Sequence, residues 1–378
     1  MQQKSYLKIT LLLVSTLTVM AAATVAASLP PMTIAFKDVP NIELLAKLVL
    51  TLPSLFIAIL APIVGININR FGRKRLLVIG MILYGVGGTS GFFLDTIYMI
   101  LLSRTVLGVS VAIILSVVST LVGDYFEAQE RHSYTGLQVA FMNIGGIVFI
   151  VLGGILAEHS WRDPFLIYLT PFFMLPLVLK YIYEPQVHQE ISDMRFSLKK
   201  IYPILLYNFI GISVFYMIPT QIPFLLYYNF GIEGTITGLA VATSMLFSTI
   251  ISMQYKHIKK KISYHKIYSI PALGLGIGFL TLSFASNLTI FFLGLAISGI
   301  GAGMLFVNNI NHLLHFTTPK TRGKIVGINS SVMAISMFFS PIFVAPLIEI
   351  FNLKETFGII GVIILFSSLW FLRSAQKE

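Results

Sequence analysis

Arg104 has the most unusual sequence surroundings of any charged residue in this chain, because it lies well inside a long apolar stretch, 97–121. Holding an arginine in hydrocarbon costs at least about 2.5–3.5 kcal/mol, so this side chain needs a partner or a use. It could meet an anion, a backbone carbonyl or a carboxylate, and the nearest carboxylate by sequence position is that of Glu43. We predict that Arg104 and Glu43 belong to a solute or proton pathway. The alternatives are a structural ion pair for Arg104 and a solvated helix end for Glu43.

Neutral polar side chains interrupt two other apolar stretches, 202–228 and 289–312, and could recognise a solute by hydrogen bonding. They are Asn208, Tyr216 and Gln221 in the first stretch, and Asn308 and Asn309 in the second, with His312 at its end. Consecutive Asn308 and Asn309 cannot both face lipid cheaply, so at least one should face the protein interior or water. His312 could titrate, although a solvated helix end is the alternative.

Several kinds of chemistry are excluded or unsupported by the residue types. The chain has no cysteine, so disulfides and thiolate metal sites are excluded. No Gly-x-x-x-x-Gly-Lys loop is present to hold a nucleotide phosphate, and the histidines are scattered. We therefore expect neither a metal nor a cofactor, and we do not expect an enzyme.

The stretches that carry these residues have the length of membrane-spanning helices. The chain is 56% hydrophobic and 11% charged, and a helix of roughly 20 apolar residues crosses a bilayer core about 30 Å thick. Twelve spans are predicted, and the fold class is an all-α integral membrane protein: 8–29, 42–65, 75–94, 97–121, 134–157, 164–183, 202–228, 236–255, 268–286, 289–312, 325–348 and 356–372.

The positions of lysine and arginine predict how the chain crosses the membrane. Basic residues collect in cytoplasmic loops, and nearly all of the 26 here fall in the loops on the side of the N-terminus. Only Lys37, Lys47, Arg162 and Lys354 fall on the other side, and Arg104 lies within a span. We expect both termini in the cytoplasm and a multi-pass protein of the plasma membrane. Anionic lipid explains the net charge of +11, so no nucleic-acid partner is expected.

The two halves of the chain resemble each other at an offset of 191 residues. This shift aligns Arg131 with Arg322, Gly136 with Gly327, and Glu158 with Glu349. It predicts a duplicated unit of six helices. We expect an N-terminal bundle over 1–183, a polar cytoplasmic linker over 184–200, and a C-terminal bundle over 201–378.

The loop between the second and third spans resembles a signature of the major facilitator superfamily. It reads G-I-N-I-N-R-F-G-R-K-R from Gly65 to Arg75. The matching residues are Gly65, Arg70, Gly72, Arg73 and Lys74, whereas Asn69 stands where the family usually has aspartate. In the family this loop gates the pathway, and the aspartate contacts the opposite half. The physical expectation is a very short turn in which Gly65 and Gly72 permit close backbone approach and a positive φ. The alternative is a basic loop without a gating role.

Two further segments are similar to the twelve-helix drug:proton antiporter branch of bacterial efflux permeases. Leu101 to Gly108 places an arginine four residues before a glycine, as in that branch. The fifth span carries only part of the branch's glycine and proline signature, in Gly145, Gly146, Gly153 and Gly154. The conservative interpretation of these glycines is close helix packing.

This resemblance implies two pseudo-symmetric bundles and a secondary active transporter. The favoured function is proton-coupled efflux of drug-like or amphiphilic small molecules by alternating access, with protons and the bilayer as partners and a monomer as the working unit. The first alternative is a facilitator or symporter for uptake of a small metabolite, since the first span lacks a carboxylate. A membrane-bound sensor or enzyme without transport is a remote alternative.

Overall fold

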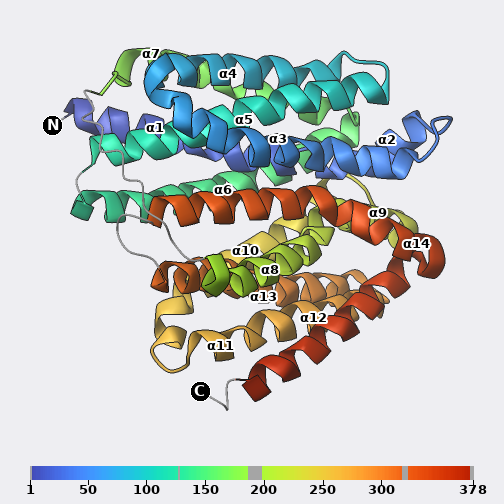
Figure 1. Ribbon diagram of the computed structural model, residues 1–378. Coiled ribbons are helices and arrows are strands. Elements are labelled where there is room, and N and C mark those ends of the chain that lie inside the picture. The colour runs from blue at the N-terminus through green and yellow to red at the C-terminus, as the bar shows by residue number, and fades with distance from the viewer. Residues whose placement is uncertain (1, 127, 186–197, 317–321, 375–378) are drawn as a thin grey trace. The chain divides into compact units, whose positions relative to one another are not determined.

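The computed structural model describes residues 2–126, 128–185, 198–316 and 322–374, which form helices with no strand among them (Figure 1). Its contacts group into two compact units: residues 1–191 with 232–238 form unit 1, and residues 192–231 with 239–378 form unit 2. The domain boundaries predicted from the sequence remain a prediction, and residues 186–197 of the predicted linker lie outside the described residues.

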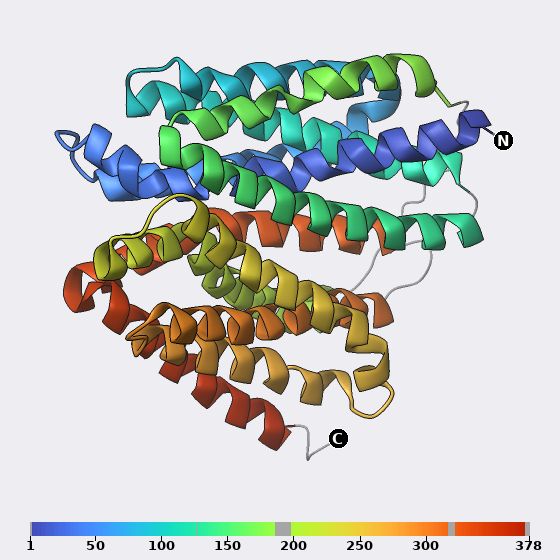
Figure 2. The same cartoon turned by 180° about the vertical axis from the view of Figure 1, so that it is seen from behind.

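Unit 1 contains seven α-helices and three short 3-10 turns. The elements are α1 Gln2–Ala23, η1 Ala26–Ser28, α2 Leu29–Ala35, α3 Ile42–Phe71, α4 Arg73–Thr89, η2 Ser90–Phe92, α5 Ile97–Tyr125, α6 Ala128–His159, η3 Asp163–Leu169 and α7 Thr170–Tyr181. Figure 2 shows α6 running alongside α1.

Unit 2 contains the remaining helices. They are α8 Leu198–Phe215, α9 Met217–Phe230, α10 Thr235–Lys259, α11 Tyr264–Ile267, α12 Ser269–Ser283, α13 Leu288–His315 and α14 Arg322–Ser374. The first residues of α10, up to Gly238, group with unit 1.

Small residues allow the long helices to pack backbone against backbone. In unit 1, a Cβ built on Gly108 of α5 would lie 2.7 Å from the carbonyl oxygen of Pro53 in α3. In unit 2, a Cβ on Gly274 of α12 would lie 2.6 Å from the Cα of Gly301 in α13. Such close approach is how apolar helices associate in lipid, where burial of apolar surface gives little drive.

The helices have the lengths that a membrane requires. Eleven of the described helical stretches are long and apolar enough to cross a bilayer. The sequence predicts twelve, and the difference arises in α14, a stretch that covers the last two predicted spans. Asn352 interrupts it with φ 57° and ψ 168°, values outside the helical region. The structure is therefore consistent with twelve spans, the last two joined at a sharp kink.

Candidate functional site

The turn between α3 and α4 consists of one residue, Gly72. Its φ of 81° is strained for residues with a side chain, and the backbone N–H of Gly72 still bonds to Ile68 at the end of α3. Gly65, which the sequence predicts to belong to the turn, lies instead within α3, and nothing lies within 4 Å of a Cβ built on it. The side chain of Asn69 lies outside the described residues, and Arg70 is exposed.

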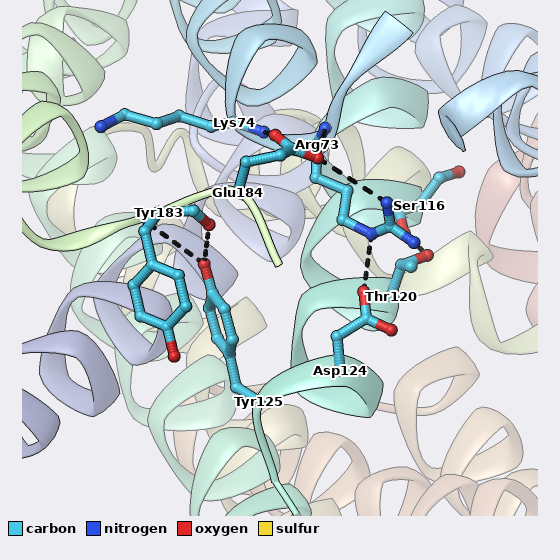
Figure 3. Close-up of polar contacts among 8 residues, drawn as sticks. All are labelled: Arg73, Lys74, Ser116, Thr120, Asp124, Tyr125, Tyr183 and Glu184. Carbon is cyan, nitrogen blue, oxygen red and sulfur yellow. Dashed lines mark hydrogen bonds and ion pairs between the residues drawn. The ribbon is translucent and has the colours of Figure 1, made fainter. Parts of the chain in front are cut away.

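Arg73 and Lys74, the first residues of α4, are held by a carboxylate from far along the chain (Figure 3). The backbone N–H of Arg73 donates to Glu184 Oε1 at 2.8 Å, and that of Lys74 donates to Oε2 at 2.9 Å. A carboxylate here satisfies two of the N–H groups that a helix leaves without partners at its start, and it favours the positive end of the helix dipole. Glu184 is thus the cap of α4.

The Arg73 side chain joins the same cluster from inside unit 1. It is only 5% exposed, and its Nε donates to Asp124 Oδ2 near the end of α5 at 2.6 Å. Its Nη1 lies 3.7 Å from Glu184 Oε1. One guanidinium therefore bridges a carboxylate of α5 and the carboxylate that caps α4, in a charge-assisted arrangement stronger than neutral hydrogen bonds.

Neighbouring contacts fix the position of Glu184. The Tyr125 hydroxyl donates to the carbonyl of Tyr183, and the Tyr183 N–H donates back to that hydroxyl oxygen at 3.2 Å. The Lys74 ammonium donates to the carbonyl of Leu179 at 2.7 Å. We call Arg73, Lys74, Asp124, Tyr125, Tyr183 and Glu184 together the α4 charge cluster. It ties the starts or ends of α4, α5 and α7 to one another.

Arg104 is completely buried, and its partners among the described residues are carbonyls, the Ser103 hydroxyl and aromatic rings rather than acids. Its Nη2 donates to the carbonyls of Gly88 at 2.6 Å and Gly87 at 3.2 Å. Its guanidinium carbon lies 4.8 Å from the ring centre of Phe165 and 5.0 Å from that of Tyr168. Carbonyl dipoles and ring faces can hold a desolvated cation. None of its contacts is with Glu43, so the predicted carboxylate partner is not the one that Arg104 uses.

Lys47 is a second buried cation, which the sequence analysis counted with the basic residues of the outer side although it falls within the predicted span 42–65. It lies in the apolar stretch Ile42–Ile68 and is 5% exposed. Its Nζ lies 3.5 Å from Oε2 of Glu43, one turn earlier in α3, whose side chain is 44% exposed. Glu43 therefore belongs to an ion pair with Lys47. The signal that could have revealed Lys47 is its spacing of four residues from Glu43.

Three helices of unit 2 meet through a chain of buried amides. Asn309 of α13 donates to Asn208 of α8 at 2.7 Å, and Asn208 donates to Asn329 of α14 at 2.7 Å. Asn208 and Asn309 are 1% exposed and Asn329 is 5% exposed. The structure thus brings together two of the predicted residues and adds Asn329, which the sequence interpretation missed although it is polar within an apolar span.

The other predicted residues of unit 2 lie apart from this amide chain. Asn308 accepts from the Tyr255 hydroxyl at 3.1 Å and donates to the Tyr264 carbonyl at 3.2 Å. His312 is 3% exposed, and its Nδ1 lies 3.1 Å from the Tyr268 hydroxyl. These contacts describe buried polar side chains that are hydrogen-bonded within unit 2.

Tyr216 and Gln221 lie at and beyond the break between α8 and α9. The Tyr216 carbonyl accepts from the Thr220 hydroxyl at 2.7 Å. Gln221 is fully buried, and neither polar atom of its amide has a hydrogen-bond partner among the described residues. An unpartnered buried amide costs about 1–3 kcal/mol per group. A ligand that bonded to Gln221 would recover that energy.

Three of the four predicted glycines of α6 lie where neighbouring backbone or side chains come close. A Cβ on Gly145 would lie 2.9 Å from Thr16 Cγ2 of α1, and one on Gly153 would collide with the carbonyl of Thr24. A Cβ on Gly154 would lie 2.8 Å from the carbonyl oxygen of Gly234, and Gly146 is buried. Gly153 and Gly154 therefore have no room for a larger residue without a shift of the backbone, whereas at Gly145 a side chain would have to move.

In the described part of the chain, no group of three or more histidine or acidic residues is placed to hold a metal ion.

Partial burial raises the pKa of Glu233, in the connection before α10, above the ordinary value for a glutamate. The sequence interpretation did not single out this residue.

Comparison with known proteins decides the family. The model of the Major Facilitator Superfamily matches residues 11–224 and 204–378, nearly the whole chain. The chain belongs to the Major Facilitator Superfamily. Members of this superfamily are transporters of small molecules rather than enzymes, and the all-helical, multi-pass fold agrees with that membership.

Two curated relatives from Bacillus subtilis (strain 168) are similar to this superfamily member. Multidrug resistance protein 1 is 31% identical over 38% of this chain and 38% of its own length, so the match spans well under half of that protein. The Bacillibactin exporter is 27% identical over 68% of this chain and 69% of its own length. A solved bacterial homologue of the human lysosomal transporter Spinster, inward-facing and unoccupied, has the same fold. Its TM-score is 0.77 at 14% identity, with 99% of this chain and 97% of that chain covered.

Proposed function

We propose that this superfamily member exports a drug-like or amphiphilic small molecule by alternating access, driven by proton entry. The observation that carries the proposal is superfamily membership over nearly the whole chain, together with similarity to relatives named for multidrug resistance and for bacillibactin export. The proposal places the chain in the plasma membrane as a functional monomer, with both termini in the cytoplasm.

The α4 charge cluster is proposed as a gating element. Gly72 makes the α3–α4 turn short, so movement of α3 is passed to the start of α4. The bond from Arg73 to Asp124 and the Glu184 cap hold one arrangement of that turn. Because Glu184 side-chain atoms remain 46% exposed, water can replace this carboxylate if the turn moves. Such an exchange would give the element the two discrete arrangements that a switch requires.

The buried amides of unit 2 are proposed as the recognition surface for cargo. Asn309 keeps one oxygen without a hydrogen-bond partner among the described residues, and Gln221 keeps its whole amide. Neutral amides bind varied hydrogen-bonding groups without requiring a fixed charge. The contacts of Arg104 with carbonyls and rings favour its structural alternative, so we assign it to the frame of unit 1 and not to cargo binding.

A proton-leak measurement tests this function. Inside-out vesicles containing the full chain are acidified, and a pH-sensitive dye is followed while cationic, neutral and anionic amphiphiles are added. Particular compounds should dissipate the gradient. Asn309→Ala should slow that response about two- to tenfold, the range expected for one lost hydrogen bond.

Asn311→Ala is the matched control, because the Asn311 amide donates only to the carbonyl of Val307 in its own helix. This variant should behave like the parent protein. If no compound dissipates the gradient while the protein remains folded, proton-coupled export is wrong.

The second candidate is a facilitator or symporter that takes up a small metabolite. One observation favours it: no aspartate or glutamate among the described residues is buried. A proton antiporter commonly uses a buried carboxyl group that alternates between a proton and the cargo. Flux of cargo that persists without a pH gradient in the same vesicles would favour this candidate over export.

A further inference from the structure

The buried charges of unit 1 within its membrane-spanning helices are positive. Lys47 and Arg104 are buried at 5% and 0% exposure, whereas every described aspartate and glutamate is at least partly exposed. Arg73, the other buried cation of unit 1, lies at the start of α4 and is matched there by Asp124 and Glu184. The charge that cargo would meet inside these spans is therefore positive.

The two cations lie toward the same end of neighbouring helices. Gly108 of α5 packs against the backbone of Pro53 in α3, and α3 and α5 run in the same direction because α4 returns between them. Arg104 lies four residues before Gly108, and Lys47 lies six residues before Pro53. At about 1.5 Å per residue, both lie within about 6–9 Å of that contact along the helix axes.

Arg104 and Lys47 differ in how their charge is held. Arg104 is enclosed by two carbonyls and two rings, so its guanidinium is fixed in the frame. The Lys47 ammonium lies 3.5 Å from the carboxylate of Glu43, whose side chain is 44% exposed. Glu43 can turn into water because its side chain is half-exposed. The Lys47 ammonium is nearly buried, so an anion that replaces this carboxylate keeps the buried charge compensated.

Hydroxyl groups follow Lys47 along the same face of α3. Thr51 lies four residues further and Ser54 seven residues further, a spacing that places all three on one face over about 10 Å. Thr51 is fully buried and Ser54 is 3% exposed. The Thr51 hydroxyl donates to the Lys47 carbonyl at 3.3 Å, a long bond for a hydroxyl donor, from which it can turn toward a stronger acceptor. The ammonium and the hydroxyls of this face are groups that can donate to the oxygens of an acidic group.

We infer that Lys47, with Thr51 and Ser54, binds the anionic group of the cargo, a carboxylate or an equivalent oxyacid, in exchange for the carboxylate of Glu43. This inference rests on the proposed transport function and names its substrate class. The positive charge of Arg104 strengthens the preference through the low-dielectric interior. A cationic amphiphile would meet the like charge of Lys47, and no buried carboxylate among the described residues could offset it.

Equilibrium binding to the full-length protein tests the inference without requiring transport. The probes are two xanthene dyes of similar size, anionic fluorescein and cationic rhodamine 6G, followed by fluorescence anisotropy, with a series of aromatic carboxylates as competitors. Fluorescein should bind at least about tenfold more tightly than rhodamine 6G. Lys47→Met should weaken fluorescein binding about tenfold or more, as expected for loss of a charge-assisted hydrogen bond, and Lys47→Arg should retain most of it.

Two further variants separate this effect from misfolding. Glu43→Gln removes the competing carboxylate and should tighten fluorescein binding, a gain that an unfolded protein cannot give. Lys37→Met is the matched control, because Lys37 is an exposed lysine in the connection that precedes α3. It removes the same charge near the same end of α3 and should leave binding unchanged.

Tighter binding of rhodamine 6G, no binding of fluorescein or the carboxylates to folded protein, or unchanged binding in Lys47→Met would overturn the anion site. Flux of both dyes in proteoliposomes separates the two proposals. Lys47-dependent binding without flux would contradict the transport function and leave the anion site standing. Flux of rhodamine 6G alone would support transport and overturn the anion site.

Discussion

In unit 1 the turn before α4 is held by charges, whereas in unit 2 the turn before α11 is held by stacked rings. The offset of 191 residues that aligns the two halves places Tyr264 at the position of Arg73 and His315 at that of Asp124. Arg73 and Asp124 form an ion pair at 2.6 Å. The rings of Tyr264 and His315 have centres 5.6 Å apart.

The surroundings of the two turns differ in the same way. In unit 2, Tyr264 stacks on His312 with ring centres 4.8 Å apart, and the Lys259 ammonium lies 4.0 Å from the Tyr264 ring centre. The cap of α11 is local, because the Ser263 hydroxyl accepts from the N–H of Lys266 at 3.4 Å. In unit 1 the cap is Glu184, more than a hundred residues from Arg73 in the chain.

Turns at equivalent positions of the two halves are thus stabilised by different kinds of contact, ion pairs in unit 1 and ring packing in unit 2. The cluster in unit 1 needs a charge partner for a nearly buried arginine, so losing one member leaves the others uncompensated. The rings in unit 2 need only a face to pack against, and losing one removes only its own contacts. The stability of the turn in unit 1 therefore depends on a distant segment, whereas that of the turn in unit 2 does not.

Of the substitutions that test this comparison, Arg73→Met should change the free energy of unfolding the most. It removes the charge shared by Asp124 and Glu184, and it should lower the free energy of unfolding by about 2–3 kcal/mol. This is less than the 3–5 kcal/mol typical of a fully buried pair, because Glu184 is half-exposed. Thermal unfolding of the full chain in detergent measures the change. Arg70→Met is the control, because Arg70 is an exposed arginine in the last turn of α3. Equal effects of both variants would show that burial of Arg73 does not matter.

Tyr264→Ala should have an intermediate effect in unit 2. It removes the stack on His312 and the cation–π contact with Lys259, and it should lower the free energy of unfolding by about 1–2 kcal/mol. Tyr264→Phe keeps the ring and should change it by less than about 0.5 kcal/mol. The same thermal measurement compares the two variants. A large loss in Tyr264→Phe would mean that the hydroxyl, and not the ring, holds this turn.

Glu184→Ala should have the smallest effect and should isolate the cap of α4. The N–H groups of Arg73 and Lys74 would lose their acceptor, which should cost about 1 kcal/mol. Glu184→Gln keeps one acceptor oxygen and should cost less. Hydrogen exchange of the first turn of α4 measures the loss directly. Unchanged protection in Glu184→Ala would show that water replaces the carboxylate without cost.

The sequence predicted the all-helical membrane class and the positions of the spans, because apolar length and the placement of charges are local properties of the chain. It also predicted that α3 and α4 are joined by a short turn at Gly72. It misplaced Gly65 in that turn. A glycine can occupy either a helix or a turn, and the residues next to Gly65 do not show which of the two glycines has the positive φ. The sequence interpretation counted Lys47 with the basic residues of the outer side and did not foresee its burial, because burial depends on what packs against a helix end.

Charged and amide groups among apolar residues can be recognised in the sequence alone: Arg104, Asn208, Asn309 and the basic residues around the turn before α4. Their partners follow from the packing of the helices. It gave Arg104 the carbonyls of Gly87 and Gly88, gave Arg73 the carboxylates of Asp124 and Glu184, and joined Asn208 to Asn329. The physical reason is that the cost of burying a polar group is fixed by its chemistry, whereas the group that offsets that cost comes from whichever helix packs beside it.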